Sequence, residues 1–283
     1  MKIEDRIRDG FEPIRLPTTL AAVRSAALRR RRARTGVWIA SVLVGAVVVA
    51  LVAPTIRPGD QNSAAARTLT QLSVTAAAQP VMSLGAGQYL YSRLQARWQS
   101  CDGDSCVWEP NVREAWVAPD GSGRSAGRRG PIAFSDLMRP GELGVDPKVP
   151  TDLDALRAYV QDRASHADQP LHYEMFVVIA DLLRESFSSP VLYSSPGLRP
   201  ALFEVAATLP GVEALGATSD EKGRPGTGVG FTHDGTRLEL IFDPDTSAIL
   251  GEREVRIADG ETVPGSWIVY LESGVVDSTD ERP

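Results

Sequence analysis

The sequence predicts an α+β fold: a single transmembrane helix followed by an extracytoplasmic domain with a twisted antiparallel sheet and helices packed on one face. Three observations lead to this prediction. Residues 36–53 carry no charged side chain. Two groups of β-favouring segments lie on either side of a helical middle at residues 151–211. Within each group the connections are short and rich in turn-forming residues, which favours antiparallel pairing.

The apolar run GVWIASVLVGAVVVALVA, residues 36–53, is long enough to cross a bilayer. As a helix it is about 27 Å long, close to the roughly 30 Å of a hydrocarbon core. Arginines are concentrated immediately before it, so the positive-inside rule places the N-terminus in the cytoplasm. These are Arg29, Arg30, Arg31, Arg32 and Arg34. A cleaved signal peptide is the competing interpretation, but the long basic region before the run argues against cleavage.

Residues 1–35 form a short basic segment on the predicted cytoplasmic side. The stretch LPTTLAAVRSAALRR within it is a candidate helix that could bind a protein partner through one apolar side, made of Leu16, Leu20, Val23 and Ala27. The alternative is a juxtamembrane helix that only orients the anchor. Residues 1–53 carry a net charge of +6, which leaves −12 for residues 54–283, because the whole chain carries −6. An acidic body argues against nucleic-acid binding by the main domain.

The two cysteines of the chain, Cys101 and Cys106, stand on either side of Asp-Gly-Asp-Ser in the stretch WQSCDGDSCVWEP. Outside the cytoplasm, two cysteines in a loop favour a disulfide. Aromatic and β-favouring flanks with a turn sequence between them predict that this disulfide closes the end of a β-hairpin. Zinc is disfavoured because the three histidines of the chain show no ligand spacing to the cysteines.

The outer domain begins after a polar linker at residues 54–63. Residues 64–79 are expected to form a helix, because Ala65, Leu69, Leu72 and Ala76 fall on one face of it. The hairpin strands are expected at Gln88–Trp98 and Val107–Val117. Residues 119–131 and 139–150 have the composition of loops.

Three helices are expected in the middle of the domain. The first begins at a capping box formed by Thr151 and Asp154, the second covers residues 172–187, and the third covers residues 198–211. The remainder alternates short β-like runs with turn sequences such as EKGRPGT, DG and PDTS. We therefore expect one sheet of about six or seven strands, although the sequence leaves open whether the two strand groups share it.

Motifs with a possible chemical role are few. Gly123–Gly127 matches the G-x-S-x-G pattern of hydrolases, but no helix is expected after Ser125 to form a nucleophile elbow. The glycines of residues 223–230 are expected to form a turn that leads into a strand rather than a phosphate loop. The pairs Asp102 with Asp104 and Asp243 with Asp245 are interpreted as turn-stabilising residues rather than calcium ligands.

Other titratable side chains also have ordinary interpretations. His166, His172 and His233 are expected at helix ends or beside a turn. Asp181, Arg184 and Glu185 are interpreted as a solvated helix face. No catalytic residue, cofactor or metal site is therefore expected.

Several segments taken together resemble a known family: GQYLYSRL, REAWVAPDGSGR, PTDLDALRAYV, ADLLRESF, ALFEVAATLPGV, ELIFDPDTSAILGE and GVVDSTDERP. They resemble actinobacterial single-pass membrane proteins commonly encoded beside extracytoplasmic-function sigma factors, over about residues 64–283. The resemblance implies a membrane-anchored regulatory role of the anti-sigma kind, with a sigma factor or another envelope protein as partner. The outline is also similar to lipoprotein-carrier and sigma-regulatory domains.

Three functions compete at this point. The first is a non-catalytic, membrane-anchored protein that signals or scaffolds across the membrane. The second is an extracytoplasmic module that binds a lipid or another apolar ligand in the concavity of its sheet. The third is a hydrolase, which rests on the Gly123–Gly127 match alone. An interior cavity favours the second function, whereas a closed core favours the first.

Overall fold

The computed structural model describes residues 58–102, 105–140, 149–258 and 260–283, without the side chains of residues 58–63, 99–102 and 105–106. All of these residues belong to one unit, Ile56–Pro283. The predicted membrane span and cytoplasmic segment fall outside the described residues and stay predictions. Within the described ranges, no helix has both the length and the apolar character that a bilayer crossing requires.

The described strands form one nine-stranded antiparallel sheet in the order β4-β3-β2-β1-β9-β8-β7-β6-β5. The first group of strands is β1 (Tyr89–Asp102), β2 (Ser105–Val117), β3 (Gly123–Arg129) and β4 (Ile132–Met138). The second group is β5 (Val212–Ser219), β6 (Pro225–His233), β7 (Thr236–Phe242), β8 (Ile249–Ala258) and β9 (Glu261–Val276). The two groups share one sheet because β1 pairs with β9, with Tyr89 opposite Val276.

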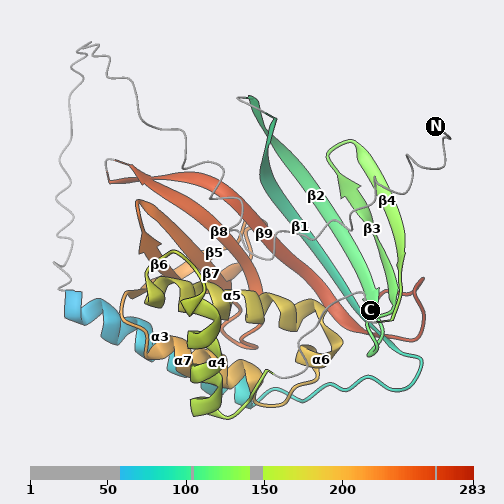
Figure 1. Cartoon of the computed structure of the whole chain (residues 1–283), viewed down its shortest axis with the longest axis horizontal. Helices are drawn as coiled ribbons and strands as arrows, with labels where there is room; N and C mark the ends of the chain where they lie inside the picture. The colour runs from blue at the N-terminus through green and yellow to red at the C-terminus, as the bar shows by residue number, and fades with distance from the viewer. Residues whose placement is uncertain (1–57, 103–104, 141–148, 259) are drawn as a thin grey trace. The chain divides into compact units, whose positions relative to one another are not determined.

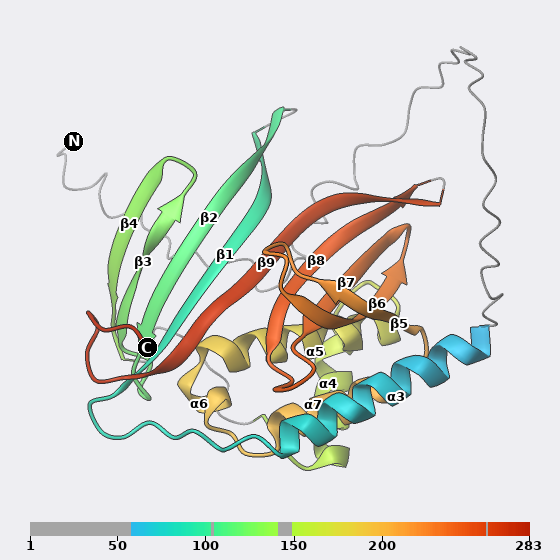
Figure 2. The ribbon, with the colours of Figure 1, turned by 180° about the vertical axis from the view of Figure 1, so that it is seen from behind.

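The helices lie on one face of the second strand group, as Figures 1 and 2 show. They are α3 (Pro58–Ala77), α4 (Leu153–Ser165), α5 (Leu171–Ser188), α6 (Pro190–Tyr193) and α7 (Leu198–Ala207). The predicted α+β arrangement of a sheet with helices on one face is therefore confirmed. The helix α3 begins at Pro58, so residues 58–63, predicted as linker, are its first turns.

A continuous apolar core fills the space between these helices and strands. Phe203 of α7 meets Phe242 of β7 edge to face, with ring centroids 5.1 Å apart, and neither ring is exposed. Phe176 of α5 packs against Phe231 of β6 in a tilted arrangement, with ring centroids 5.8 Å apart. Aromatic pairs of this kind add to the stability gained by burying each ring. The predicted α3 face is also correct, since Ala65, Leu69, Leu72 and Ala76 are all buried.

Three local predictions differ from the structure. Residues 123–129 form β3 rather than a loop, because β2 and β4 pair with both of its edges. The sheet consequently has more strands than the six or seven expected. Asp152, not Thr151, caps α4, and its carboxylate accepts a hydrogen bond from the backbone N–H of Ala155 at 3.0 Å. An Asp carboxylate is a strong acceptor for such an unpaired N–H group.

The C-terminal tail, residues 277–283, covers an aromatic cluster on the face of the first strand group that points away from the helices. This cluster contains Tyr91 and Trp116, whose rings lie 5.2 Å apart. The indole N–H of Trp116 donates to the backbone carbonyl of Glu281 at 2.6 Å. Arg282 donates to both oxygens of Glu114, which lowers the pKa of that carboxyl to about 2. The tail is thus held by hydrogen bonds and an ion pair as well as by apolar contact.

Removing residues 277–283 is expected to expose the ring of Trp116, which is only 2% exposed in the intact chain. We expect tryptophan emission to shift to longer wavelength and the midpoint of thermal unfolding to fall. Because the chain has five tryptophans, the same deletion in a Trp116→Phe background serves as the control, and there the emission shift should be absent. An emission shift of equal size in both backgrounds would contradict the assignment.

Candidate functional site

In the described part of the chain, the C-terminal end of α5 contributes to the lining of two hollows on the helix side of the sheet. The larger, about 290 Å³, lies between α5, α6, the start of α7, the segment after α3 and the turn between β7 and β8. We call it the α6 cleft. The smaller, about 100 Å³, is lined by β1, β2 and Ser188, and we call it the β1–β2 hollow. The two are neighbours, since Ser273 in the cleft is the register partner of Ser92 in the hollow.

The inner wall of the α6 cleft is apolar and firmly packed. Leu183 of α5, Leu192 of α6 and Ile249 of β8 line it, and all three are buried in the fold. Phe187, one turn after Leu183, lines the cleft and stacks edge to face on Tyr270 of β9, with ring centroids 4.9 Å apart. An apolar ligand could therefore bind to this wall without a rearrangement of the protein, because the apolar surface is already formed.

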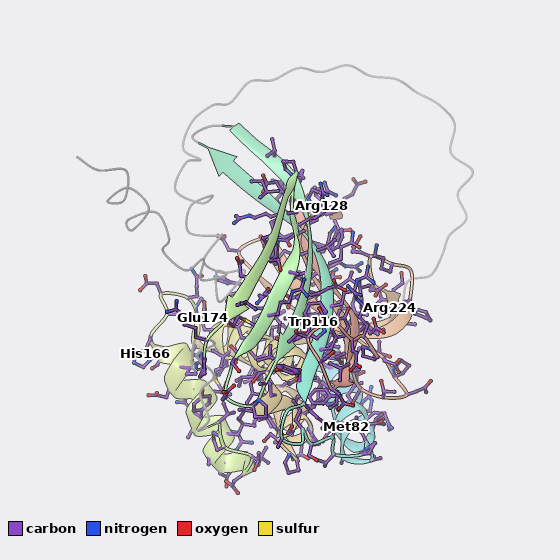
Figure 3. All side chains as sticks on the ribbon, turned by 90° about the vertical axis from the view of Figure 1, so that its right-hand side faces the viewer. Met82, Trp116, Arg128, His166, Glu174 and Arg224 are labelled. Atoms are coloured by element: carbon purple, nitrogen blue, oxygen red, sulfur yellow. The ribbon has the colours of Figure 1, made fainter. Side chains whose placement is uncertain are left out.

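The outer rim of the cleft exposes apolar side chains to solvent. Val81 and Met82, in the segment after α3, line the cleft and are 61% and 44% exposed. Figure 3 shows Met82 beside α3 at the base of the domain. The rim is held in place because the Gln79 side-chain amide donates to the backbone carbonyl of Asp245 in the β7–β8 turn, at 3.3 Å. Met is well suited to guests of varied shape because its thioether chain is flexible and polarisable.

One cation lies in the cleft, the guanidinium of Arg199 in the first turn of α7. It is partly buried, and burial lowers the pKa of this guanidinium, an effect that the hydroxyl of Tyr193 opposes. Tyr193 also lines the cleft, and burial raises the pKa of its hydroxyl. No carboxylate of the described residues forms a hydrogen bond or salt bridge with Arg199.

Arg113 lines the β1–β2 hollow, and its guanidinium, like that of Arg199, is removed from water by burial. Burial lowers the pKa of its guanidinium, and its Nε donates to the hydroxyl of Ser125 at 3.1 Å. Ser125 belongs to the G-x-S-x-G match, and the structure places it inside β3, opposite Ala115 and Asp136. A nucleophile elbow requires a turn from a strand to a helix, so this serine does not have the geometry that the hydrolase hypothesis needs.

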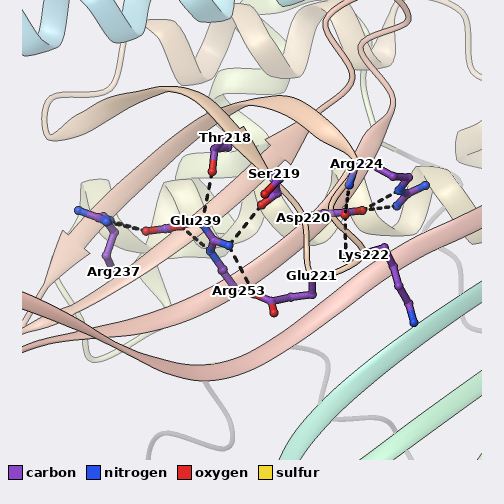
Figure 4. A network of polar contacts seen from close by, with 9 residues as sticks. All are labelled: Thr218, Ser219, Asp220, Glu221, Lys222, Arg224, Arg237, Glu239 and Arg253. Atoms are coloured by element: carbon purple, nitrogen blue, oxygen red, sulfur yellow. Dashed lines mark hydrogen bonds and ion pairs between the residues drawn. The ribbon is translucent and has the colours of Figure 1, made fainter.

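Several other partly buried arginines of the domain are paired with carboxylates. On the sheet face away from the helices, Arg253 donates to Glu239 at 2.7 Å, and Arg237 donates to the same carboxylate at 2.8 Å (Figure 4). In the β5–β6 turn, Arg224 donates to Asp220 at 2.7 Å and to two backbone carbonyls. These networks hold strands and turns together, and every charge in them has its counterpart.

A buried charged cluster lies on the same part of α5 that lines the cleft. Arg184 of α5 donates to both oxygens of Glu252 of β8, at 3.2 and 3.1 Å, and its Nη1 lies 3.0 Å from Oδ1 of Asp181. Oδ1 is buried and accepts no well-aligned hydrogen bond. Burial raises the pKa of Asp181 to about 7, and the charge of Glu252 adds to this increase although Arg184 opposes it. The interpretation of Asp181 as part of a solvated helix face was therefore wrong.

The remaining predicted site residues are scattered. Cys101 and Cys106 are register partners across the β1–β2 hairpin, but their side chains are outside the described ones, so the disulfide stays a prediction. His166 is the C-cap residue of α4, and His233 lies 2.9 Å from the Gln169 side chain. Asp243 accepts from the backbone N–H groups of its own turn, as expected. The structure does not describe the predicted topology arginines (Arg29, Arg30, Arg31, Arg32, Arg34) or the partner-helix residues (Leu16, Leu20, Val23, Ala27).

Comparison with known proteins adds little. No protein-family profile and no curated protein matches the sequence. Among solved structures, a domain from Vibrio parahaemolyticus described as a putative outer membrane lipoprotein-sorting protein covers 77% of this chain and 93% of its own, at 8% identity and a TM-score of 0.20. The resemblance to sigma-factor-associated membrane proteins stays untested.

Proposed function

We propose that the outer domain is an extracytoplasmic binding module that takes a small apolar or amphipathic molecule into the α6 cleft, and that residues 36–53 anchor it to the membrane. The observation that carries this proposal is a preformed cleft with a buried apolar inner wall and exposed apolar side chains at its rim. Its volume of about 290 Å³ lies just below the range for small-molecule pockets, roughly 300–1,000 Å³. It suits one alkyl chain.

Photocrosslinking of the full-length protein in native membranes tests this function. A neutral alkyl alcohol that carries a diazirine is expected to label peptides from α5, α6 and the segment after α3. Ser195 lines the cleft and is partly buried. Ser195→Trp should therefore fill the cleft and reduce this labelling at least about fivefold, while His172→Trp, on the exposed first turn of α5, should leave it unchanged. Labelling spread evenly over the domain would overturn the proposal.

The signalling role implied by the family resemblance is a separate proposal about residues 1–35. Its test is affinity capture from native membranes with the full-length protein and with a variant that lacks residues 1–30 but keeps Arg31, Arg32 and Arg34. Recovery of a sigma factor only with the full-length chain would support a transmembrane regulator. Equal recovery of partners with both forms would leave the segment as an anchor.

A further inference from the structure

The α6 cleft contains a charge that an entirely apolar guest would not use. Arg199 lines the cleft together with Tyr193, and the segment after α3 closes the opposite side. A guanidinium that loses water without gaining a carboxylate is destabilised, unless the guest supplies the missing anion. On Arg253 and Arg224 the fold supplies carboxylates itself, so the absence of one at Arg199 leaves this charge available to a ligand.

Arg199 lies at the N-terminal end of α7, where the helix dipole adds to the positive electrostatic potential of the guanidinium. It is the second residue of α7, and Gly197, the N-cap residue, provides no side-chain cap. The first turn of a helix carries partial positive charge, which disfavours a cation and favours an anion. In α7 this contribution is small, because Pro200 has no N–H group and the N–H of Leu198 already donates to a backbone carbonyl at 3.4 Å, so the guanidinium is the main positive group. The guanidinium and the start of the helix thus act in the same direction, in a cleft that has an apolar inner wall and otherwise only neutral polar side chains.

Because the domain carries a net negative charge, any attraction of an anion is confined to the immediate surroundings of Arg199. Residues 54–283 carry −12, so the average field of the domain repels anions. At physiological ionic strength that field is largely screened beyond about 8 Å, whereas a contact inside a partly buried cleft is screened much less. An anion would therefore be held only where a guanidinium meets it directly.

Building on the proposed function, we infer that the ligand of the α6 cleft is a single-chain amphiphile with an anionic head group. Its chain lies along Leu183, Phe187 and Leu192, and its carboxylate or phosphate accepts hydrogen bonds from the Arg199 guanidinium. The hydroxyls of Tyr193 and Ser195 also line the cleft in this part of the chain. Val81 and Met82 cover the part of the chain nearest the solvent.

Three diazirine probes of equal chain length test this inference in native membranes: an alkyl carboxylate, an alkyl phosphate and the neutral alkyl alcohol. The measured quantity is the ratio of cleft labelling by each anion to cleft labelling by the alcohol, which removes differences in folding between variants. Arg199→Gln is expected to lower this ratio about tenfold, as loss of one charge-assisted interaction predicts. Arg199→Lys should retain part of it, because the charge remains.

Two further variants separate this site from general electrostatic attraction. Arg113→Gln removes the comparable arginine of the neighbouring β1–β2 hollow, and Arg256→Gln removes an exposed arginine of β8. Both should leave the ratio unchanged. The two anions distinguish the source of the head group: the one whose ratio depends more strongly on Arg199 identifies a fatty acid or a phosphate-bearing lipid.

The possible results distinguish a failure of the anionic head group from a failure of the proposed apolar binding function. If the alcohol labels the cleft but Arg199→Gln leaves both anion ratios unchanged, the anionic head group is wrong and the apolar binding function stands. If Arg113→Gln or Arg256→Gln lowers the ratio as much as Arg199→Gln does, the attraction is not specific to the cleft and the inference is overturned. If no probe labels the cleft, the proposed function itself fails.

Discussion

Asp181→Asn is expected to stabilise the domain at pH 8 and to flatten the dependence of its stability on pH. The pKa of Asp181 is raised from its ordinary value of 3.8 to about 7, chiefly by burial. Between these two pH values the folded state binds more protons than the unfolded state, so stability falls as the pH rises. The contribution is fully present below about pH 4 and is lost by about pH 7.

The size of this effect follows from the difference between the two pKa values. A difference of about three units corresponds to at most about 4 kcal/mol in the free energy of unfolding, and relaxation of the buried site reduces it. Asparagine keeps the shape and one acceptor oxygen but cannot ionise. The variant should therefore lose the decrease in stability between about pH 4 and pH 7 that the wild-type protein shows.

Urea unfolding of the full chain in detergent, followed by tryptophan fluorescence at pH 4, 6 and 8, measures this. Asp168→Asn is the matched control, because Asp168 is an exposed carboxylate just before α5. Its pH profile should coincide with that of the wild-type protein. Equal slopes for Asp181→Asn and the wild type would show that Asp181 ionises normally in the folded state.

Local sequence signals predicted much of this fold. A period-3.6 pattern located α3, an apolar run located α5, and the sequence DG at residues 234–235 predicted the tight β6–β7 hairpin. The structure confirms it with positive φ at both residues, 47° and 69°. β3 was missed because GRSAGRR has few β-favouring residues. Its strand conformation comes from pairing with β2 and β4, and no pattern within the segment itself encodes that pairing.

The candidate site was harder to predict for a related reason. Asp181 and Arg184 have the spacing of an exposed ion pair on a helix, and only Glu252, 68 residues beyond Arg184, makes them part of a buried cluster. Arg199 in LRPALFEV is indistinguishable from a surface residue of a first helical turn. The cleft around it is built from four separate parts of the chain, namely residues 76–82, 183–200, 246–249 and Ser273, so its existence depends on packing that single-sequence patterns do not report.

Glu252→Gln is expected to cost about 3–5 kcal/mol of unfolding free energy at pH 8, the range for breaking a buried ion pair by removing one partner. The Glu252 side chain has no exposed surface, and its two oxygens receive the Arg184 guanidinium. Glutamine keeps the shape and one acceptor but leaves Arg184 with Asp181 as its remaining carboxylate. Glu261→Gln, at an exposed position of β9, is the control and should change stability by less than about 0.5 kcal/mol.

The loss of Glu252 should also reverse the effect of Asp181→Asn. The charge of Glu252 raises the pKa of Asp181 and that of Arg184 lowers it, so in Glu252→Gln the Asp181 carboxyl ionises at lower pH and becomes the counterion of Arg184. Asp181→Asn then removes both carboxylates paired with this guanidinium and destabilises the domain further at pH 8, whereas in the wild-type background it stabilises. Urea unfolding of the two single variants and the double variant measures this coupling directly. Additive effects would show that the two carboxylates do not share Arg184.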